Sequence, residues 1–414
     1  MSLPFKNVSV IGLGYIGLPT AAVLASRGVN VLGVDVNPNT VDTVNQGKIH
    51  IIEPDLDIVV RSVVQTENLR ATTTPEPSDA FLIAVPTPIL DNKQPDLSYV
   101  EAAAKAIAPV LEKGNLVVVE STSPVGTTEM VAEWLKHARP DLCFPCDSTD
   151  QADIHIAHCP ERVLPGYVLQ ELVSNDRIIG GLSKACSQRA VELYKIFVRG
   201  DCITTNARTA EMSKLTENSF RDVNIAYANE LSVICDKLKI NVWELIRLAN
   251  RHPRVNVLSP GPGVGGHCIA IDPWFIVDSC PEEAKLILQA RLTNDAKPHY
   301  VVDKVTRHAE EFKAPVIACL GVTYKPDIDD MRESPALQIV QELAAHYGNK
   351  MYVVEPNIHA LPEDLVRAGV ELMPLDSAVE GANIIVALVN HKEFADIDKT
   401  QLTAKVVIDT HGII

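Results

Sequence analysis

The stretch that decides the fold is residues 7–17, which read NVSVIGLGYIG. Its first five residues are mostly apolar and predict a short buried strand. A GxGxxG pattern formed by Gly12, Gly14 and Gly17 follows directly, and the ten residues from Leu18 have helical character. A strand, a glycine turn and a helix in this order are typical of a dinucleotide-binding unit, because the glycines let a pyrophosphate approach the backbone where the helix begins.

An acidic residue downstream supports a dinucleotide whose ribose is unmodified. Asp35 ends the next predicted strand, Asn30–Asp35, and lies eighteen residues after Gly17. A carboxylate at this position can accept hydrogen bonds from both ribose hydroxyls. The residues after it, 36–38, include no arginine that could meet a 2′-phosphate. A tight turn without a ligand would explain the glycines but not Asp35, so we expect NAD rather than NADP.

Strands and helices alternate both before and after a long central helix. The first part predicts a parallel, doubly wound sheet with strands at 7–11, 30–35, 80–85, 116–120 and 154–157. Residues 208–239 contain no proline or glycine and predict one helix of about 48 Å. We therefore expect an α/β protein with two Rossmann-like parallel-sheet domains, residues 1–205 and 301–414, joined by the long central helix and a helical middle domain, residues 206–300.

The composition limits the partners and the location. The chain has 414 residues and a formal net charge of −16, which disfavours nucleic acid or an anionic membrane as a partner. No apolar run reaches the roughly 18 residues that a membrane span needs, and the start of the chain lacks a signal-peptide pattern. Nine scattered cysteines are unlike a disulfide framework. We expect a cytoplasmic protein whose thiols are mostly buried.

One group of residues superficially resembles a metal site: Cys143, Cys146, His155, His158 and Cys159. Its spacing fits no standard zinc pattern, and residues 155–158 read as alternating strand positions. We therefore expect no metal site.

Polar side chains recur on one face of the central helix. Glu211, Lys214, Asn218, Arg221 and Ile225 follow one another at steps of three and four residues. Such a set is usually a solvated face, but its continuation into Ile225 and apolar neighbours favours burial. A buried lysine beside an amide can polarise a substrate or move a proton. The pattern therefore leaves a structural and a catalytic interpretation open.

Basic residues stand at several predicted turns of this acidic protein: Arg162, His252, Arg254, Lys325 and Arg332. Each one alone is most simply a surface charge. Together they favour a phosphorylated substrate, because a few local cations outweigh the global charge at contact distance.

One cysteine has unusual neighbours. The stretch 259–274, SPGPGVGGHCIAIDPW, places Cys268 after Gly263, Gly265 and Gly266 and four residues before Asp272. The glycines allow the backbone to approach a ligand closely, and a thiol at the start of a helix is activated. We expect Cys268 to be presented to a substrate rather than packed as a small hydrophobe.

Long motifs in a fixed order resemble one family. After GLGYIGLP come CPERVLPG, AEMSKLTENSFRDVNIAYANEL, RHPRVN, PGPGVGGHCIAIDP and GVTYKPDIDDMRESP. In this order, from about residue 8 to residue 407, they resemble the UDP-sugar 6-dehydrogenase family. Members close to UDP-glucose dehydrogenase typically have Ser-Cys-Phe and then Lys-Asp around the thiol. This chain has HCI at 267–269 and IDP at 271–273, which resembles the N-acetylhexosamine branch and most of all its UDP-N-acetyl-D-mannosamine members.

The resemblance implies an NAD-dependent four-electron oxidation of the C6 alcohol of UDP-N-acetyl-D-mannosamine to a carboxylate, for polysaccharide precursors. A thiolate captures the intermediate aldehyde as a thiohemiacetal, and the second oxidation gives a thioester that water hydrolyses. It implies Cys268 as the nucleophile, Lys214 as general base or oxyanion-stabilising cation, and Asn218 as a hydrogen-bond donor. Asp272 would assist Lys214 and the hydrolytic water, and Glu161 and Thr122 would serve in proton transfer and water positioning.

The same resemblance assigns two sets of contacts. Besides the glycine turn, those to NAD are Tyr15, Ile16, Asp35, Thr87, Thr127 and Arg332. Those to the UDP-sugar are Arg162, Val163, Lys214, Asn218, Arg221, His252, Arg254, Gly265 and Lys325. Family members assemble through the central helix, so a homodimer or higher homo-oligomer is expected. This chain departs from the pattern at His411, where a basic residue often stands.

Three alternatives stay open at this point. The same reaction could act on UDP-N-acetylglucosamine or UDP-glucose, although His252, Arg254 and His267 favour an acetamido sugar. A two-electron hydroxyacid dehydrogenase would share the N-terminal fold and the central helix without needing a nucleophilic cysteine or a last domain. A non-catalytic nucleotide-sugar-binding scaffold is disfavoured, because the four predicted catalytic residues occur together: Cys268, Lys214, Asn218 and Asp272.

Overall fold

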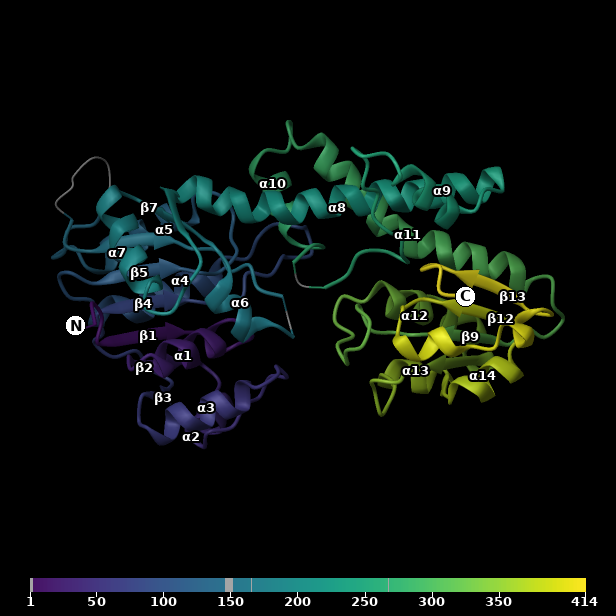
Figure 1. The fold of residues 1–414 in the computed structure, drawn as a ribbon, viewed down its shortest axis with the longest axis horizontal. Coiled ribbons are helices and arrows are strands. Elements are labelled where there is room, and N and C mark those ends of the chain that lie inside the picture. Colours follow the sequence, from purple (N-terminus) through teal and green to yellow (C-terminus); the bar gives the residue numbers. More distant parts are fainter. Residues whose placement is uncertain (1–2, 146–151, 165, 267) are drawn as a thin grey trace. The chain divides into compact units, whose positions relative to one another are not determined.

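The computed structural model describes residues 3–145, 152–164, 166–266 and 268–414 (Figure 1). The chain separates into two compact units. The first comprises Met1–Glu217 with Trp274–Ser279, and the second comprises Asn218–Pro273 with Cys280–Ile414.

The first unit is built on an eight-stranded sheet with the strand order β3-β2-β1-β4-β5-β6-β7-β8. The strands are β1 (Asn7–Ile11), β2 (Asn30–Val34), β3 (Leu69–Thr72), β4 (Ala80–Ile83), β5 (Leu116–Val119), β6 (His155–His158), β7 (Arg177–Gly181) and β8 (Cys202–Asn206). Neighbours pair in parallel except β6 and β7, which pair antiparallel through Ala157 and Gly181. The predicted doubly wound parallel sheet is confirmed, with an antiparallel join that the sequence did not indicate.

Helices cover both faces of this sheet, because successive strand residues point to opposite sides. Leu82 packs into a core with α1, α3, α6 and α7, whereas its neighbours Phe81 and Ile83 pack into a second core with α4 and α5. The helices of this unit are α1 (Gly17–Ser26), α2 (Pro38–Asn45), α3 (Leu56–Gln65), α4 (Ser98–Ile107), α5 (Thr127–Ala138), α6 (Val168–Ser174) and α7 (Lys184–Tyr194).

The central helix, α8 (Ala207–Leu238), has 32 residues and confirms the predicted helix to within one residue at each end. It has no glycine or proline, so nothing in it interrupts the helical hydrogen bonds. It is followed by α9 (Val242–Ala249), α10 (Asp272–Ser279) and α11 (Lys285–Ala309). In the described part of the chain, no helix is both long enough and apolar enough to cross a membrane.

The second unit contains a five-stranded parallel sheet with the order β11-β10-β9-β12-β13. Its strands are β9 (Ile317–Leu320), β10 (Met351–Val354), β11 (Glu371–Leu372), β12 (Ile384–Ala387) and β13 (Val406–Asp409). Val386 packs with α11 and α12 on one face, and Ile385 packs with α14 on the other. The remaining helices are α12 (Pro335–Tyr347), α13 (Glu363–Arg367) and α14 (Leu375–Gly381). The second Rossmann-like sheet is therefore also confirmed.

Candidate active site

The glycine turn between β1 and α1 has two glycines that the chain itself requires and one that it does not. Gly12 has a φ of +93°, and a Cβ on it would lie 2.6 Å from the carbonyl oxygen of Ala84. A Cβ on Gly17 would lie 1.8 Å from the carbonyl oxygen of Gly12. A Cβ on Gly14 would meet no described atom within 4 Å other than those of Gly14 itself and its neighbours in the chain. A close-approaching ligand explains Gly14, and this open position at the start of α1 suits a pyrophosphate.

Asp35 is oriented by the turn that it faces. Its Oδ2 accepts the N–H of Leu13 at 2.9 Å, and its Oδ1 accepts the N–H of Asn37 at 2.9 Å. The half-buried carboxylate is thereby fixed, while each oxygen keeps a further lone pair for a ribose hydroxyl. Tyr15 is exposed and Ile16 half-buried on the same turn. These residues fit the dinucleotide that the sequence predicts.

The predicted Thr87 and Thr122 lie in two loops that are bonded to each other after β4 and β5, and Thr127 is the first residue of α5. The hydroxyl of Thr87 donates to the carbonyl oxygen of Thr122, and that of Ser121 donates to Val85 at 2.7 Å. Thr127 is buried, and its hydroxyl donates to the carbonyl oxygen of Pro124 at 2.7 Å. The hydroxyl protons of Thr87 and Thr127 are therefore used inside the protein.

Glu211 has a structural task that the helical pattern did not reveal. From α8 it accepts the N–H of Gly126 at 2.7 Å and both the N–H and the hydroxyl of Thr128, at 2.8 and 2.6 Å. It is 1% exposed, and burial raises its pKa above the ordinary value. Glu211 thus caps α5 and fixes the loop of Thr122 to the helix turn that carries Lys214.

Glu161 lies in a buried polar cluster. One carboxylate oxygen pairs with Arg177 at 2.7 Å and the other accepts the N–H of Arg162 at 2.5 Å. Nearby, the hydroxyl of Tyr194 donates to Glu120 at 2.6 Å. Burial and, after it, the charge of Glu161 raise the pKa of Glu120 to about 7. The sequence missed Arg177, Glu120 and Tyr194, because these partners come from separate strands and a helix.

Arg162, a predicted substrate contact, is engaged by α8. Its Nε donates to one carboxylate oxygen of Glu217 at 3.1 Å, and its Nη2 lies 2.7 Å from the other. Val163 beside it is half-buried against the core of the first unit. A substrate phosphate would therefore meet an arginine that is already oriented by a carboxylate.

In the second unit, Cys268 is exposed just before a helix, as predicted. Its carbonyl oxygen accepts the N–H groups of Ile271 and Asp272, at 3.0 and 2.8 Å, and α10 begins at Asp272. Cys143 and Cys280 are exposed too, so exposure alone does not distinguish Cys268. His267 and Cys146 lie outside the described residues.

Two more of the predicted catalytic residues touch each other. The amide of Asn218 donates to Asp272 at 2.5 Å, and both side chains are at least 95% buried. Lys214 precedes Asn218 by one turn of α8, so the two lie on the same helical face. Within the second unit, the structure thus links the Cys268 loop to the predicted amide on α8.

The glycines before Cys268 pack against the segment that leads into α12. A Cβ on Gly265 would lie 2.3 Å from the carbonyl oxygen of Glu333, and one on Gly266, whose φ is +83°, would lie 2.9 Å from the ring of Tyr324. The glycines are therefore required by close approach. Lys325, half-buried, follows Tyr324 in this segment.

The other predicted cationic residues lie on the surface. Arg221, His252, Arg254 and Arg332 are exposed, and Arg332 pairs with Asp330 at 2.7 Å. His411 instead contacts the carbonyl oxygen of Leu388 through Nε2 at 3.0 Å, and a Cβ on Gly261 would lie 3.3 Å from its ring. Burial lowers the pKa of His411. His411 therefore packs against the start of the Cys268 loop.

Comparison with known proteins accounts for nearly the whole chain. Residues 6–198, 208–296 and 318–414 match the NAD binding, central and UDP binding domains of the UDP-glucose/GDP-mannose dehydrogenase family. The chain belongs to the UDP-glucose/GDP-mannose dehydrogenase family.

Full-length relatives support this assignment. The chain is 63% identical over 413 residues to the NDP-N-acetyl-D-galactosaminuronic acid dehydrogenase of Ralstonia nicotianae, covering 100% of this chain and 97% of the relative. It is 60% identical over 402 residues to the UDP-N-acetyl-D-mannosamine dehydrogenase of Campylobacter jejuni, covering 97% and 99%. The solved UDP-D-ManNAc dehydrogenase of Pyrococcus horikoshii is 39% identical with a TM-score of 0.88, covering 99% and 96%.

The family's UDP binding domain repeats the turn of its NAD binding domain with one difference. Gly321 has a φ of +90°, like Gly12, and the N–H of Val322 donates to Glu355 at 2.9 Å, as Leu13 does to Asp35. Glu355, however, also pairs with His391 at 3.0 Å, and both are fully buried. Burial alone would raise the pKa of Glu355, but the hydrogen bonds from His391 and the backbone lower it. The carboxylate that would bind a ribose is thus already saturated.

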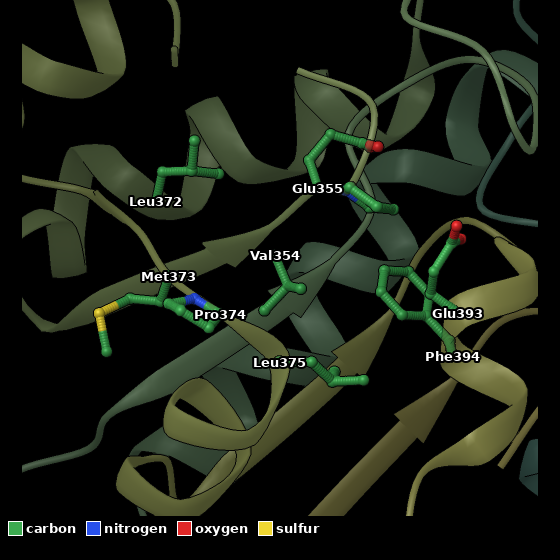
Figure 2. A pocket seen from close by; sticks show the side chains of 9 residues that line it. Val354, Glu355, Leu372, Met373, Pro374, Leu375, Glu393 and Phe394 are labelled. Atoms are coloured by element: carbon green, nitrogen blue, oxygen red, sulfur yellow. The ribbon is translucent and has the colours of Figure 1, made fainter. Parts of the chain in front are cut away.

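A pocket of about 440 Å³ lies beside Glu355 in the same domain (Figure 2). It is mostly apolar, with Val354, Met373 and Leu375 on its walls and the carboxylates of Glu355 and Glu393 toward one end. None of the residues predicted to bind the UDP-sugar lines it.

Within the described residues, one group of potential metal ligands converges: Asp327, His391 and Glu393 lie within 4.8 Å of one another. The Nδ1 atom of His391 already accepts the N–H of Asp327 at 3.0 Å, so its lone pair is engaged. The run from Cys143 to Cys159 contributes no residue to this group.

Proposed function

We propose that this chain oxidises the C6 alcohol of UDP-N-acetyl-D-mannosamine to the carboxylate. One sugar, two NAD⁺ and one water give the uronate, two NADH and three protons. The observation that carries the proposal is the Asn218–Asp272 contact at the foot of the loop that presents Cys268. That arrangement suits covalent capture of an aldehyde followed by hydrolysis, which a two-electron dehydrogenase does not need.

NAD, when bound, accepts a hydride in each of the two oxidations. Lys214 takes the proton of the C6 hydroxyl, or stabilises the oxyanion that forms, and Asn218 donates to that oxygen. The Cys268 thiolate adds to the aldehyde carbon and forms a C–S bond, which water cleaves at the thioester stage. Asp272, which follows Cys268 in the same loop, accepts a hydrogen bond from Asn218 on α8. With Glu161 and Thr122, it is proposed to orient that water and to take its proton.

The proposed binding residues fall into two sets. NAD is held by the glycine turn and Asp35, with Tyr15, Ile16, Thr87, Thr127 and Arg332. The UDP-sugar is held by Arg162, Val163, Arg221, His252, Arg254, Gly265 and Lys325, besides Lys214 and Asn218. We also propose that the domains are residues 1–205, which bind NAD, residues 206–300, which form the helical middle domain, and residues 301–414, which bind the UDP-sugar.

The choice of sugar has a second candidate. The Ralstonia nicotianae relative carries the name of an N-acetyl-D-galactosaminuronic acid dehydrogenase at 63% identity, slightly above the 60% of the Campylobacter jejuni mannosamine enzyme. Both names concern a nucleotide-linked N-acetylhexosamine or its uronate, and the galacto sugar is therefore the second candidate. UDP-N-acetylglucosamine, UDP-glucose and a non-catalytic scaffold remain as further outcomes of the test.

The decisive measurement follows NADH release with UDP-N-acetylmannosamine, UDP-N-acetylgalactosamine, UDP-N-acetylglucosamine and UDP-glucose. We expect two NADH per sugar and the highest kcat/KM with the manno sugar. A tenfold preference for another sugar would move the assignment to that sugar. One NADH with free aldehyde would overturn the four-electron reaction, and no NADH with any of them would favour the scaffold.

We also propose that the chain forms a homodimer through α8. Phe220, Tyr227, Ile234 and Leu238 are 69%, 54%, 43% and 62% exposed, and their spacing of seven, seven and four residues puts them on one face. An apolar stripe of this kind is a typical interaction surface.

A cytoplasmic location and a role in surface polysaccharide precursors are proposed as well. The eight described cysteines are free thiols, which suits a reducing compartment.

Replacing both Phe220 and Tyr227 with aspartate is expected to convert the dimer to a monomer, because each charge would have to be desolvated in the interface. Sedimentation at micromolar concentration measures this. Val366→Asp is the matched control, since Val366 is 58% exposed on α13 and outside the stripe. An unchanged assembly in the double variant, or equal loss in the control, would contradict the proposed interface.

A further inference from the structure

The loop that carries Cys268 is fastened to α8 at both ends. Downstream of the thiol, Asp272 accepts from Asn218 at 2.5 Å. Upstream, the N–H of Gly261 donates to Oδ1 of Asn229 at 2.9 Å. Asn218 and Asn229 are eleven residues apart, which is about three turns, so both lie on the same face of α8 and about 16 Å apart along it. Cys268 lies between these two attachments.

The side chain of Asn229 is itself oriented by a buried chain of hydrogen bonds. Its Nδ2 donates to Oδ1 of Asn294 on α11 at 2.9 Å, and Nδ2 of Asn294 donates to the carboxylate of Asp222 at 2.8 Å. Arg291 pairs with the same carboxylate at 2.6 Å. All four residues are no more than 1% exposed.

The carboxylate of Asp222 determines which atom of each amide donates in this series of hydrogen bonds. Asp222 can only accept when it is ionised and paired with Arg291, so the amide nitrogen of Asn294 must face it. The oxygen of Asn294 then faces Asn229 and requires the nitrogen of Asn229. That leaves the Asn229 oxygen to accept from the backbone of Gly261. The orientation of each amide is therefore fixed from the buried ion pair to the loop. A flipped Asn229 would set its oxygen against the oxygen of Asn294 and its nitrogen against the N–H of Gly261.

We propose that Asp222, Asn294 and Asn229 are positioning residues that hold the upstream arm of the Cys268 loop for the second half of the reaction. This inference rests on the proposed function. Hydride transfer from the alcohol needs the sugar and NAD in place, whereas capture of the aldehyde also needs the thiol within about 3.5 Å of the carbon. Gly263, Gly265 and Gly266, which lie between Gly261 and Cys268, pack on residues 324–335. The bond from Gly261 to Asn229 is therefore where α8 holds the upstream arm.

The test is Asn229→Ala, with NADH and free aldehyde measured together. The aldehyde is trapped as its oxime with hydroxylamine and quantified by mass spectrometry. We expect the first NADH to form within twofold of the wild-type rate and uronate formation to fall about 10- to 100-fold, the usual effect of misplacing a reacting group by about 1 Å. More than a tenth of the sugar should leave as aldehyde, and the KM for sugar should change less than threefold.

Asn294→Ala provides the second variant if Asn229→Ala does not fold. Both single variants and the double variant are expected to leak aldehyde equally, because they break one chain of contacts. Asn383→Ala is the matched control, since Asn383 likewise accepts one backbone N–H, that of Val316 at 3.0 Å, away from the loop. The Asn383→Ala control should still release two NADH per sugar.

Two results would overturn the inference. Asn229→Ala with two NADH per sugar and wild-type turnover would show that the chain of contacts does not position the thiol. Equal loss of both oxidations would reduce Asn229 to a general structural residue. Wild-type enzyme that gives one NADH would instead refute the proposed four-electron function, so the two failures are distinguishable.

Discussion

Replacing Cys268 with serine is expected to lower uronate formation by on the order of 10³-fold or more, the size of effect seen when a nucleophile is removed. The first oxidation does not involve the thiol and should still yield NADH. A serine hydroxyl is a far weaker nucleophile than a thiolate, and an ester is hydrolysed more slowly than a thioester. The enzyme should therefore release aldehyde or hold a covalent, partly oxidised sugar. NADH stoichiometry and intact mass spectrometry measure both.

Cys280→Ser is the matched control for this prediction. Cys280 is also exposed and lies twelve residues downstream, between α10 and α11. It follows no glycine-rich loop, and no residue of the Asn218–Asp272 pair is its neighbour in the sequence, so its replacement should leave two NADH per sugar and turnover within twofold. Full turnover by the Cys268 variant would remove this thiol from the mechanism.

The fold was predictable where apolar residues mark the buried face of an element. The long helix α11 was not predicted, because its buried face carries Arg291, Asn294 and Lys297 and its interior contains Pro298. These residues read as solvated or helix-breaking in a sequence. They form hydrogen bonds here with partners on α8, about 65 to 70 residues away in the chain. Burial lowers the pKa of Lys297 to about 8, which reflects how far it is from solvent.

The candidate site was likewise predictable only where a residue's role follows from a local sequence pattern. Asp35 could be predicted because its role follows from a fixed distance to the glycines in one strand–turn–helix unit. The equivalent Glu355 had the same local signal, an acidic residue ending the second strand after a glycine turn, but His391 that saturates it comes from after β12. Residues that position others through long-range contacts, such as Asn229 and Glu211, have no local pattern. A sequence therefore reveals a reactive side chain more readily than it reveals the residues that position that side chain.

His158 at the end of β6 has a pH effect that can be measured. It is fully buried, and no described residue hydrogen-bonds to either ring nitrogen. Burial lowers its pKa from 6.5 to about 3. The unfolded chain therefore binds a proton that the folded chain refuses between pH 6.5 and 3. The free energy of unfolding is therefore undiminished by His158 above pH 6.5. It decreases as pH falls through this window, by about 2 kcal/mol at pH 5.

His158→Leu is therefore expected to gain about 2 kcal/mol of unfolding free energy relative to wild type between pH 7.5 and pH 5. Glu120 has the opposite dependence: its pKa is raised to about 7, so its ionisation lowers stability as pH rises from 4.5 through 7. Because the two slopes oppose each other, wild type alone can look insensitive to pH here. The informative quantity is the difference between each variant and wild type in urea unfolding at fixed protein concentration. Glu120→Gln should change that difference in the direction opposite to His158→Leu, and curves that stay parallel to wild type from pH 7.5 to 5 would show that neither group titrates as its burial requires.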